Sequence, residues 1–493
     1  MDFGATVILT LVLSVTWLIF SIRRTYKRRK NLPPGPTPLP FLGNVLQLNR
    51  KDLPKSFIQL AKVYGDVFTV HLGSRTVVIL HGYEAVKEAL VENSEAFGDR
   101  AKVPGAQIVF KGYGVMISNG ERWKQLRRFS LTTLRNFGMG KRSVEERIQE
   151  ESLCLTEVLR SQAGSPFDPT YLVTLAVSNV ICSIVFGQRF DYDDENFLGL
   201  LAMLKASFRI RNSIAGLLLN SFPKIIHHLP GPHHEVIRSF QTLQDFVMDK
   251  VKEHEKTLDQ NSPRDFIDCY LIKKKEEKDN PDTEFNYQNL VATLINIFLA
   301  GTETSSTTIR LSLRILLKYP DVLAKVQEEI DQVIGQNRCP SVEDRSKMPY
   351  TDAVIHEIHR MADVLPMSVP HATAHTTIFR GYTIPKGTTV FPLLTSVLKD
   401  PKHFQNPYEF NPQHFLDENG RFYKKEAFMP FSAGKRMCLG EGMARMEVFL
   451  FITSILQRFN LKSDEDPSDI DITPLPNSNS TIHRFFEMCL VPR

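Results

Sequence analysis

The most informative stretch of the sequence is Phe431-Ser432-Ala433-Gly434-Lys435-Arg436-Met437-Cys438-Leu439-Gly440, which an apolar helical pattern follows. A cysteine just before a helix lies where unpaired backbone N–H groups and the positive end of the helix dipole favour the thiolate, the form that ligates metal. Gly434 and Gly440 allow tight turns and close approach to a flat cofactor, and Arg436 can pair with an anionic group on it. The stretch therefore predicts a metal-cofactor site rather than an inert core cysteine.

A second stretch, Ala300-Gly301-Thr302-Glu303-Thr304, lies in the middle of the longest helical pattern, 287–318. A threonine inside a helix can bond to the carbonyl one turn earlier and distort the helix, and a glycine removes the side chain that would block a ligand. These residues predict a notch of about the size of an oxygen molecule, although a plain polar helix face remains the alternative.

Together these stretches resemble the cytochrome P-450 family, whose haem-binding loop reads Phe-x-x-Gly-x-Arg-x-Cys-x-Gly. Its five fixed positions are filled by Phe431, Gly434, Arg436, Cys438 and Gly440. The resemblance implies a b-type haem whose iron is ligated by the thiolate of Cys438. It also implies that Ala300 and Gly301 belong to the cofactor site, and that Thr304 and Glu303 are the catalytic residues, which bind dioxygen and relay protons.

Other segments extend the resemblance. Trp123 and Arg127 match a Trp-x-x-x-Arg helix that binds the haem carboxylates, and their spacing puts them on one helix face. Arg100, His371 and Arg436 match further contacts to these carboxylates in family 2 of the vertebrate microsomal enzymes, the group that this chain resembles most, over residues 32 to 490.

Glu357 and Arg360 are spaced so that they can meet on a helix, and His414 stands where many relatives have arginine. The resemblance implies that these three residues are structural and hold the cysteine loop in place.

The N-terminus predicts a membrane anchor. Residues 3–22 carry no charge and are long enough to cross a bilayer, and six basic side chains follow within residues 23–30. This order favours a retained signal anchor over a cleaved leader. We expect a single-pass protein of the endoplasmic reticulum membrane, with an anchor and basic cluster at 1–30, a proline-rich spacer at 31–44, and a cytosolic haem-thiolate catalytic domain at 45–493.

The catalytic domain is predicted to be mainly α: the cytochrome P-450 fold, a large helical bundle around a buried haem with a small β-rich region. An early hairpin is expected at 67–72 and 76–80, and a second strand-rich patch at 372–391. Helical patterns cover 119–136, 143–162, 169–185, 194–210, 234–258, 287–318, 321–335, 350–361 and 440–457.

Composition limits the partners. The net charge of +5 is contributed by residues 1–30, so the body is neutral overall and no nucleic-acid partner is expected. The six cysteines show no disulfide framework or zinc spacing. No strand–GxGxxG–helix unit binds a nicotinamide, so NADPH must act through a partner. The resemblance implies NADPH–cytochrome P-450 reductase, with cytochrome b5 as a further candidate. The cations of this chain that are expected to dock the reductase are Lys124, Arg127, Arg128, Arg135, Lys141, Arg142, Lys424, Lys425 and Lys435.

The resemblance implies a monooxygenase that inserts one atom of dioxygen into an apolar substrate. Pocket positions inferred from relatives, among them Phe110, Val115, Phe208, Phe298 and Ile482, are nearly all apolar, which favours a fatty acid, a steroid or a foreign compound. The apolar segment 214–226 is expected to contact membrane lipid. Two alternatives remain open: a haem-thiolate isomerase or dehydratase acting on peroxides, and a non-enzymatic haem sensor.

Overall fold

The computed structural model describes residues 12, 16, 31–49, 51–136, 144–211, 214–226, 228–473 and 485–493. The chain divides into two compact units, and it passes repeatedly from one to the other. The sheet unit consists of residues 1–101, 367–397 and 433–435, and the helical unit consists of residues 102–366, 398–432 and 436–493.

The predicted anchor at 1–30 lies outside the described residues except for Val12 and Thr16, which are helical. Among the residues that are described, no helix combines the length and the apolar character needed to span a bilayer. The anchor and the boundaries at residues 30 and 44 stay predictions.

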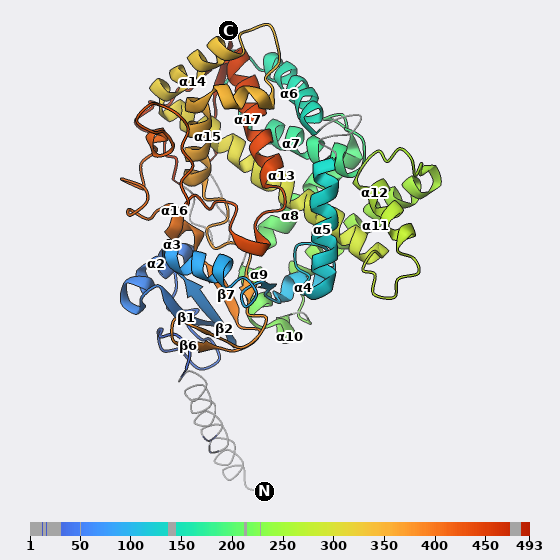
Figure 1. The fold of residues 1–493 in the computed structure, drawn as a ribbon, viewed down its shortest axis with the longest axis vertical. Coiled ribbons are helices and arrows are strands. Elements are labelled where there is room, and N and C mark those ends of the chain that lie inside the picture. The colour runs from blue at the N-terminus through green and yellow to red at the C-terminus, as the bar shows by residue number, and fades with distance from the viewer. Residues whose placement is uncertain are drawn as a thin grey trace. The chain divides into compact units, whose positions relative to one another are not determined.

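The sheet unit is built around five strands in the order β1-β2-β7-β4-β3. The predicted hairpin is confirmed as β1 (Val67–Leu72) and β2 (Arg75–Leu80). Strand β7 (Thr389–Pro392) runs parallel to β2, and β4 (His371–Ala372) joins β7 to β3 (Asp99–Arg100). Figure 1 shows β7, from late in the chain, beside β2.

The rest of the sheet unit covers and extends this sheet. Phe57 of helix α2 (Leu53–Tyr64) packs with Phe68, Val77 and Ile79 into one apolar core. The strands β5 (Thr377–Phe379) and β6 (Tyr382–Ile384) form a separate hairpin, so the second strand-rich patch is confirmed. Helix α3 (Gly82–Lys87) continues into a π-helical turn, Glu88–Glu92.

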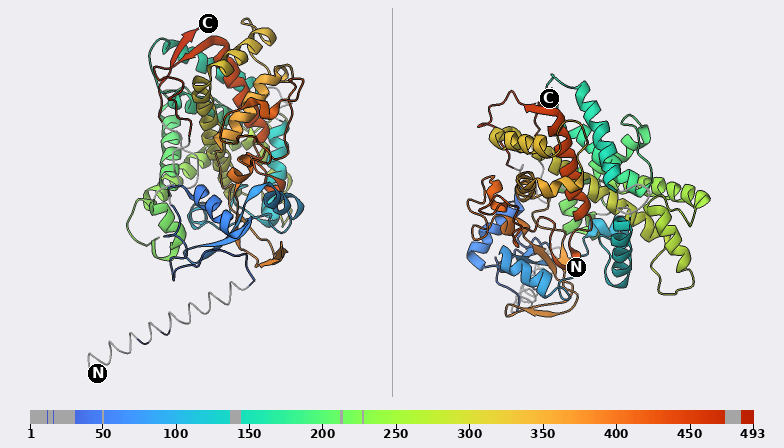
Figure 2. Two further views of the ribbon diagram at one scale, coloured as in Figure 1. Left: turned by 90° about the vertical axis from the view of Figure 1, so that its left-hand side faces the viewer. Right: turned by 45° about the horizontal axis from the view of Figure 1, so that its top comes forward.

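The helical unit is organised around α13 (Tyr287–Lys318), whose bounds coincide with the predicted ones. Helix α7 (Thr170–Val185) packs along it, and α6 (Val144–Ser161) and α17 (Glu441–Arg458) join the same apolar core. Figure 2 shows α17 (red) running beside α13. Because α13 is apolar on most of its circumference, it is buried on both sides of a short central interval.

The remaining predicted helices are confirmed within a few residues: α5 (Gly120–Asn136), α8 (Glu195–Arg211), α11 (His233–Thr257), α14 (Pro320–Val333) and α15 (Pro349–Ala362). The sequence patterns missed several short elements: α4 (Pro104–Phe110), α9 (Ile214–Ser221), α10 (Pro223–Ile226), α12 (Phe266–Glu276), α16 (Leu394–Leu398) and the strand pair β8 (Phe459–Lys462) and β9 (Cys489–Pro492).

Candidate active site

The cysteine loop ends at a helix N-terminus, as predicted. Helix α17 begins at Glu441 with Gly440 as its N-cap, so Cys438 lies two residues before the cap. The backbone N–H of Cys438 donates to the carbonyl oxygen of Phe431 at 3.0 Å, which closes the loop on itself. The Cys438 side chain is exposed. A soft donor is thus accessible at the positive end of a helix.

The two glycines of the loop have different roles. Gly434 adopts a φ of +70°, and a Cβ atom on it would lie 1.8 Å from the carbonyl oxygen of Leu90 in the same unit, so only glycine fits. A Cβ atom on Gly440 would meet only the Met443 methyl group, at 3.9 Å. The chain's own packing therefore does not require glycine at 440.

An aromatic ring with two cations lies beside the loop in the helical unit. The Trp123 ring lies 3.8 Å from the guanidinium carbon of Arg436 and 5.9 Å from that of Arg127. Arg127 donates to the carbonyl oxygen of Met437 at 2.7 Å, and Arg436 donates to the carbonyl oxygen of Ser118 at 2.9 Å. Three of the residues predicted to hold the haem carboxylates are therefore brought together.

The same residues are electrostatically tied to the cysteine. Burial lowers the pKa of Arg127 below its ordinary value, and the negative charge of an ionised Cys438 acts in the opposite direction. A guanidinium that a thiolate stabilises also stabilises that thiolate, which is the form that binds iron.

Arg100 and His371 meet in the sheet unit, although many residues separate them in sequence. They are register partners in the antiparallel pair β3 and β4. Arg100 donates to the carbonyl oxygen of Val369 at 2.8 Å, and the Nδ1 atom of His371 lies 2.8 Å from the carbonyl oxygen of Phe97. Pairing in the sheet thus places a cation and an imidazole side by side.

The middle of α13 is open where the catalytic residues were predicted. Residues 291–298 are buried, Ala300 is exposed, and Leu299, Gly301, Glu303 and Thr304 are half-buried. The hydroxyl of Thr304 donates to the carbonyl oxygen of Ala300 at 2.7 Å, so the predicted bond to the preceding turn is confirmed. Such an accessible interval in an otherwise buried helix is where a cofactor would lie.

Gly301 faces the neighbouring helix α7. A Cβ atom there would lie 2.5 Å from the Cδ1 atom of Ile181 in α7. The missing side chain makes room for Ile181, and the predicted place of Gly301 in the cofactor site stays a prediction.

The cysteine loop and the open interval of α13 share one core. Leu439, which follows Cys438, and Leu299, which precedes Ala300, pack against the same apolar cluster of the helical unit. Further along the two helices, Ser305 of α13 lies beside the buried carboxyl of Glu447 in α17, whose pKa burial raises to about 8. A thiolate donor, two arginines and an open helix interval thus belong to one unit, and this donor set fits a haem.

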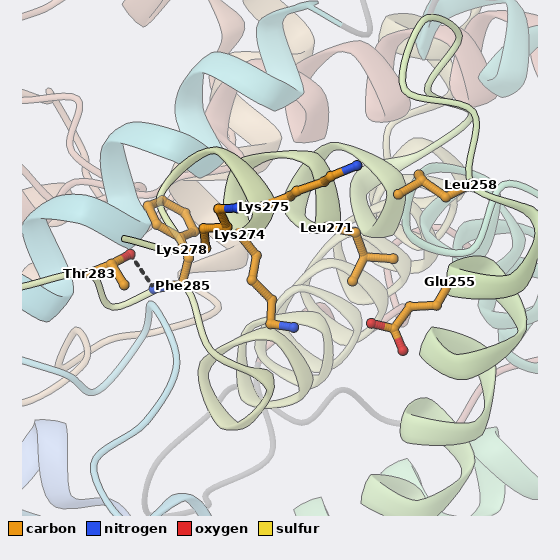
Figure 3. Close-up of a pocket in the computed structure, with 8 residues that line it drawn as sticks. All are labelled: Glu255, Leu258, Leu271, Lys274, Lys275, Lys278, Thr283 and Phe285. Atoms are coloured by element: carbon orange, nitrogen blue, oxygen red, sulfur yellow. Dashed lines mark hydrogen bonds between the residues drawn. The ribbon is translucent and has the colours of Figure 1, made fainter. Parts of the chain in front are cut away.

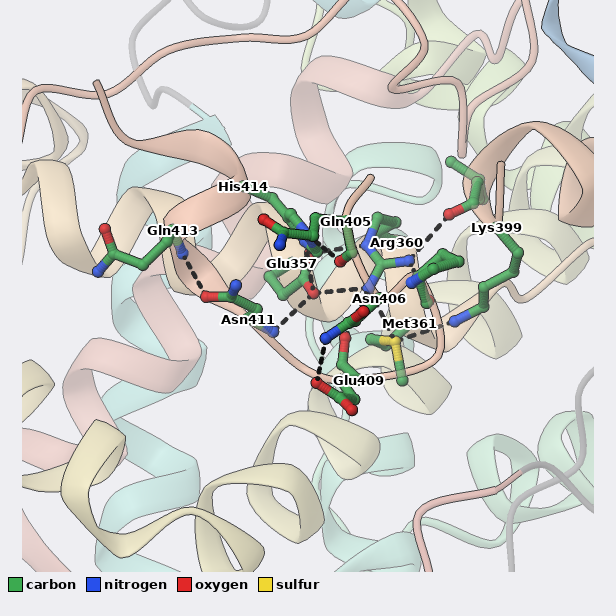
Figure 4. A network of polar contacts seen from close by, with 12 residues as sticks. Glu357, Arg360, Met361, Lys399, Gln405, Asn406, Glu409, Asn411, Gln413 and His414 are labelled. Atoms are coloured by element: carbon green, nitrogen blue, oxygen red, sulfur yellow. Dashed lines mark hydrogen bonds and ion pairs between the residues drawn. The ribbon is translucent and has the colours of Figure 1, made fainter. Parts of the chain in front are cut away.

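The predicted structural cluster forms a buried network, shown in Figure 4. Arg360 and Glu357 make a bidentate ion pair at 2.7 Å with both side chains fully buried. Arg360 also donates to the carbonyl oxygens of Leu398, Pro407 and Glu409, and His414 lies 3.2 Å from Glu357. Burial alone would raise the pKa of Glu357, but hydrogen bonds from Arg360 and His414 bring it below its ordinary value. The network fixes α15 to the segment that leads to the cysteine loop.

Sequence reasoning missed the side chains packed behind the loop, namely His356, His359, Arg445 and Glu447. The spacing of Glu441 and Arg445, four residues apart on a helix, was a signal that could have indicated an ion pair there.

A pocket of about 500 Å³ lies elsewhere in the helical unit, and Figure 3 shows it. Its lining combines apolar side chains with three lysines and consists of Glu255, Leu258, Leu271, Lys274, Lys275, Lys278, Thr283 and Phe285. None of the predicted haem residues lines it, so this pocket does not belong to the candidate active site.

A helical fold with an accessible cysteine before a helix and arginines beside it fits a haem-thiolate protein. Comparison with known proteins agrees: a family model described as cytochrome P-450 matches residues 33–484. The chain is 55% identical over 486 residues to human cytochrome P-450 2C8, and the match covers 99% of both chains. It is 53% identical to rat cytochrome P-450 2C55 over 487 residues and to human cytochrome P-450 2A13 over 490 residues, again with 99% coverage of each chain.

The chain therefore belongs to the cytochrome P-450 family and is a monooxygenase of that family.

Proposed function

We propose that this monooxygenase acts on an apolar substrate, a fatty acid, steroid or foreign compound, with electrons from NADPH that a membrane-bound reductase delivers. The observation that supports it best is the exposed Cys438 at the N-terminus of α17, next to Arg127 and on the same core as the open interval of α13. When bound, the haem supplies the iron at which dioxygen is activated.

Each haem contact follows from the chemistry of the side chain. Cys438 would supply the thiolate that ligates the haem iron, and Phe431, Gly434 and Gly440 would shape the loop around it. Arg127 and Arg436 are proposed to bind the carboxylates of the haem, because buried carboxylates need cationic partners, and Trp123 is proposed to donate its indole N–H to them. Arg100 and His371, paired in the sheet unit, are proposed as the remaining carboxylate ligands.

Thr304 and Glu303 are proposed to manage protons beside Ala300 and Gly301. The Thr304 hydroxyl donates to the Ala300 carbonyl, so its oxygen is left to accept a hydrogen bond, and its own proton can be passed on only when the O–H turns away from that carbonyl. Glu303 is half-buried; burial lowers the pKa of Arg310, and the charges of Asp168 and Glu303 oppose that effect, so the Glu303 carboxylate has both a cation and access to water. We assign Glu303 to taking up protons and Thr304 to delivering them.

The substrate class rests on apolar side chains. Phe110, Val115 and Phe298 are buried in the cluster that also contacts Leu299 and Leu439. Phe208 and Ile482 were predicted to line the same pocket, but the side chain of Phe208 and residue Ile482 lie outside what the structure describes. An apolar surrounding favours an apolar molecule.

Electron delivery is proposed to use the basic side chains named from the sequence. Arg128, Arg135 and Lys424 are exposed and form no ion pair within the described residues. Two of the other predicted cations form ion pairs, Lys124 with Glu121 and Lys435 with Glu95. Two donate to backbone carbonyl oxygens, Arg127 to that of Met437 and Lys425 to that of His403. Lys141 and Arg142 lie outside the described residues. We propose that the three open cations attract an acidic flavoprotein reductase, with cytochrome b5 as a second partner on the same charges.

The proposed setting is the endoplasmic reticulum membrane, with the catalytic domain on the cytosolic side. It is supported by the uncharged run at 3–22 and the basic cluster after it. The apolar helices α9 and α10 are proposed to contact lipid.

Replacement of Cys438 by alanine tests the ligand assignment. We expect the ferrous–carbonyl absorption band that is typical of thiolate-ligated haem to disappear, because no other side chain is assigned to the iron. The absorption spectrum of purified protein measures this, and an unchanged spectrum would refute the proposed function.

Replacement of Thr304 by alanine tests the proton assignment. We expect haem content to be retained and release of hydrogen peroxide to rise at the expense of product, because protons are no longer delivered in order. Reconstitution with reductase, NADPH and isotopically labelled dioxygen measures product and peroxide together. Fully coupled turnover would contradict the role of Thr304, whereas turnover of a lipid hydroperoxide without NADPH would favour the isomerase.

A further inference from the structure

Arg445 lies behind the cysteine loop with every part of its guanidinium engaged. It is the fifth residue of α17, seven after Cys438. Its Nε and Nη2 atoms donate to one carboxylate oxygen of Glu441 at 3.0 and 2.8 Å. Its Nη1 atom donates to the Nε2 atom of His356 at 2.7 Å. A side chain held at three nitrogen atoms has a fixed position and orientation.

His356 is built to accept this bond. Its Nδ1 atom lies 2.7 Å from the carbonyl oxygen of Asp352, so Nδ1 carries the proton and Nε2 is the acceptor. Burial lowers the pKa of His356, Asp352 opposes this effect, and the charge of Arg445 adds to it. Asp352 is itself paired with Arg345 at 2.8 Å. The imidazole is therefore neutral, and it anchors Arg445 without a competing charge.

The flat face of Arg445 is turned toward two aromatic rings before the cysteine. Its guanidinium carbon lies 5.0 Å from the ring centre of Phe431 and 5.3 Å from that of Phe428. The His359 ring contacts Phe431 edge-on, with the ring centres 5.2 Å apart. Phe431 is thus held between a cation and an imidazole, and its carbonyl oxygen accepts the N–H of Cys438.

We propose that Arg445 is a positioning residue for the haem thiolate, acting through Phe431 on Cys438. This inference rests on the proposed ligation of the haem iron by Cys438. Arg445 packs on the ring of Phe431, whose carbonyl oxygen accepts the cysteine N–H, and its positive charge lies next to the loop that carries the thiolate. Reduction of ferric to ferrous haem adds one negative charge to the site, so a nearby cation favours the reduced state.

Two substitutions of opposite charge test this proposal. Arg445→Met keeps the aliphatic stem and removes the cation, so we expect the midpoint potential of the haem to become more negative. At a fixed potential the ratio of ferric to ferrous protein should rise about threefold. Glu441→Gln removes the anion beside Arg445, so the ratio should fall. Loosening of the loop alone would move both variants in the same direction.

A matched control lies on the same helix. Arg458, the last residue of α17, lies 3.7 Å from Glu157 in an ion pair away from the loop. Arg458→Met should leave the midpoint potential unchanged. Arg445→Lys keeps the charge but not the planar geometry of the side chain. Compared with Arg445→Met, it should recover more of the midpoint potential of the unmodified protein than of its thermal stability.

The outcomes separate this inference from the proposed function. If the unmodified protein lacks the ferrous–carbonyl band of thiolate ligation, the proposed function fails. If that band is present but the midpoint potentials of Arg445→Met and Glu441→Gln are unchanged, or shift in one direction, only the inference about Arg445 is overturned. If Arg445→Met does not retain haem, the sign of the shift in Glu441→Gln decides.

Discussion

Gly434 illustrates how a single atom constrains the cysteine loop. Its positive φ and the carbonyl oxygen of Leu90 both exclude a side chain. The sequence motif contains this glycine, and the need for a tight turn could be predicted from it. The identity of the opposing group could not, because Leu90 lies in a π-helical turn that no periodicity in the sequence predicts.

We expect Gly434→Ala to prevent formation of the loop. Left-handed backbone strain costs about 1–2 kcal/mol and overpacking about 1–3 kcal/mol, which together are a large part of the stability of a typical protein. Haem content per protein and the thermal unfolding midpoint measure the effect.

Gly381→Ala is the control for that experiment. Gly381 has a φ of +82°, and a Cβ atom on it would meet no other group within 4 Å, so this variant carries the strain without the collision. A Gly434→Ala variant no less stable than Gly381→Ala would contradict the packing argument.

Site residues were easier to predict than their neighbours. Thr304, Trp123, Arg127 and Cys438 stand out because their side chains are unusual in their positions or match a family motif. The neighbours of Gly301 and Arg445 could not be predicted in this way. Gly301 faces Ile181 and Arg445 contacts His356, and both contacts depend on how helices pack, which the residue spacing along one helix does not describe.

At the scale of elements, α11 and α12 are joined by one buried pair. The Nε2 atom of His254, near the end of α11, lies 2.7 Å from Asp265, the N-cap of α12. The Nδ1 atom of His254 lies 2.7 Å from the carbonyl oxygen of Lys250. Burial lowers the pKa of His254, but Asp265 outweighs this effect and the net shift is upward; the nearby Asp268 acts in the same direction and is paired with Arg264.

This pair predicts a pH-dependent stability. The pKa of His254 is higher in the folded state than its unfolded value of about 6.5. The pair therefore contributes fully to the free energy of unfolding below about pH 6.5, and this contribution is lost as the pH rises through the folded pKa. His254→Gln should lose about 1 kcal/mol at about pH 6 and less at about pH 9. The unfolding midpoint against pH measures this. The exposed His375→Gln serves as the control, and a His254→Gln profile parallel to that of the unmodified protein would contradict the assignment.

Long elements were predictable and short ones were not. Helix α13 has a continuous apolar pattern, so its bounds follow from the sequence. Strand β8 directly follows α17 and pairs with β9, which lies beyond the segment 474–484, so no local pattern marks it. Pairings such as that of β3 with β4 depend on residues remote in the chain, and only the resemblance connected Arg100 with His371.

At the scale of the whole molecule, the electron supply predicts a salt-dependent interaction. Arg128→Glu and Lys424→Glu should each slow reduction of the haem by the reductase several-fold at low salt, and the difference should shrink as salt screens the charges. Stopped-flow reduction at increasing ionic strength measures it. Lys278→Glu reverses an exposed lysine outside the predicted set, and an equal effect of this variant would show that only net charge matters.

The parallel pairing of β2 with β7 has a consequence during synthesis on the ribosome. Val77 pairs with Thr389, and the residues between them include α13 and most of the other helices. At roughly 5–20 residues per second, some 300 residues take roughly 15–60 s to translate. For that time one edge of β2 in the nascent chain has no native partner, while the helices downstream can already form from local contacts. The sheet, whose first strands leave the ribosome early, is therefore completed late.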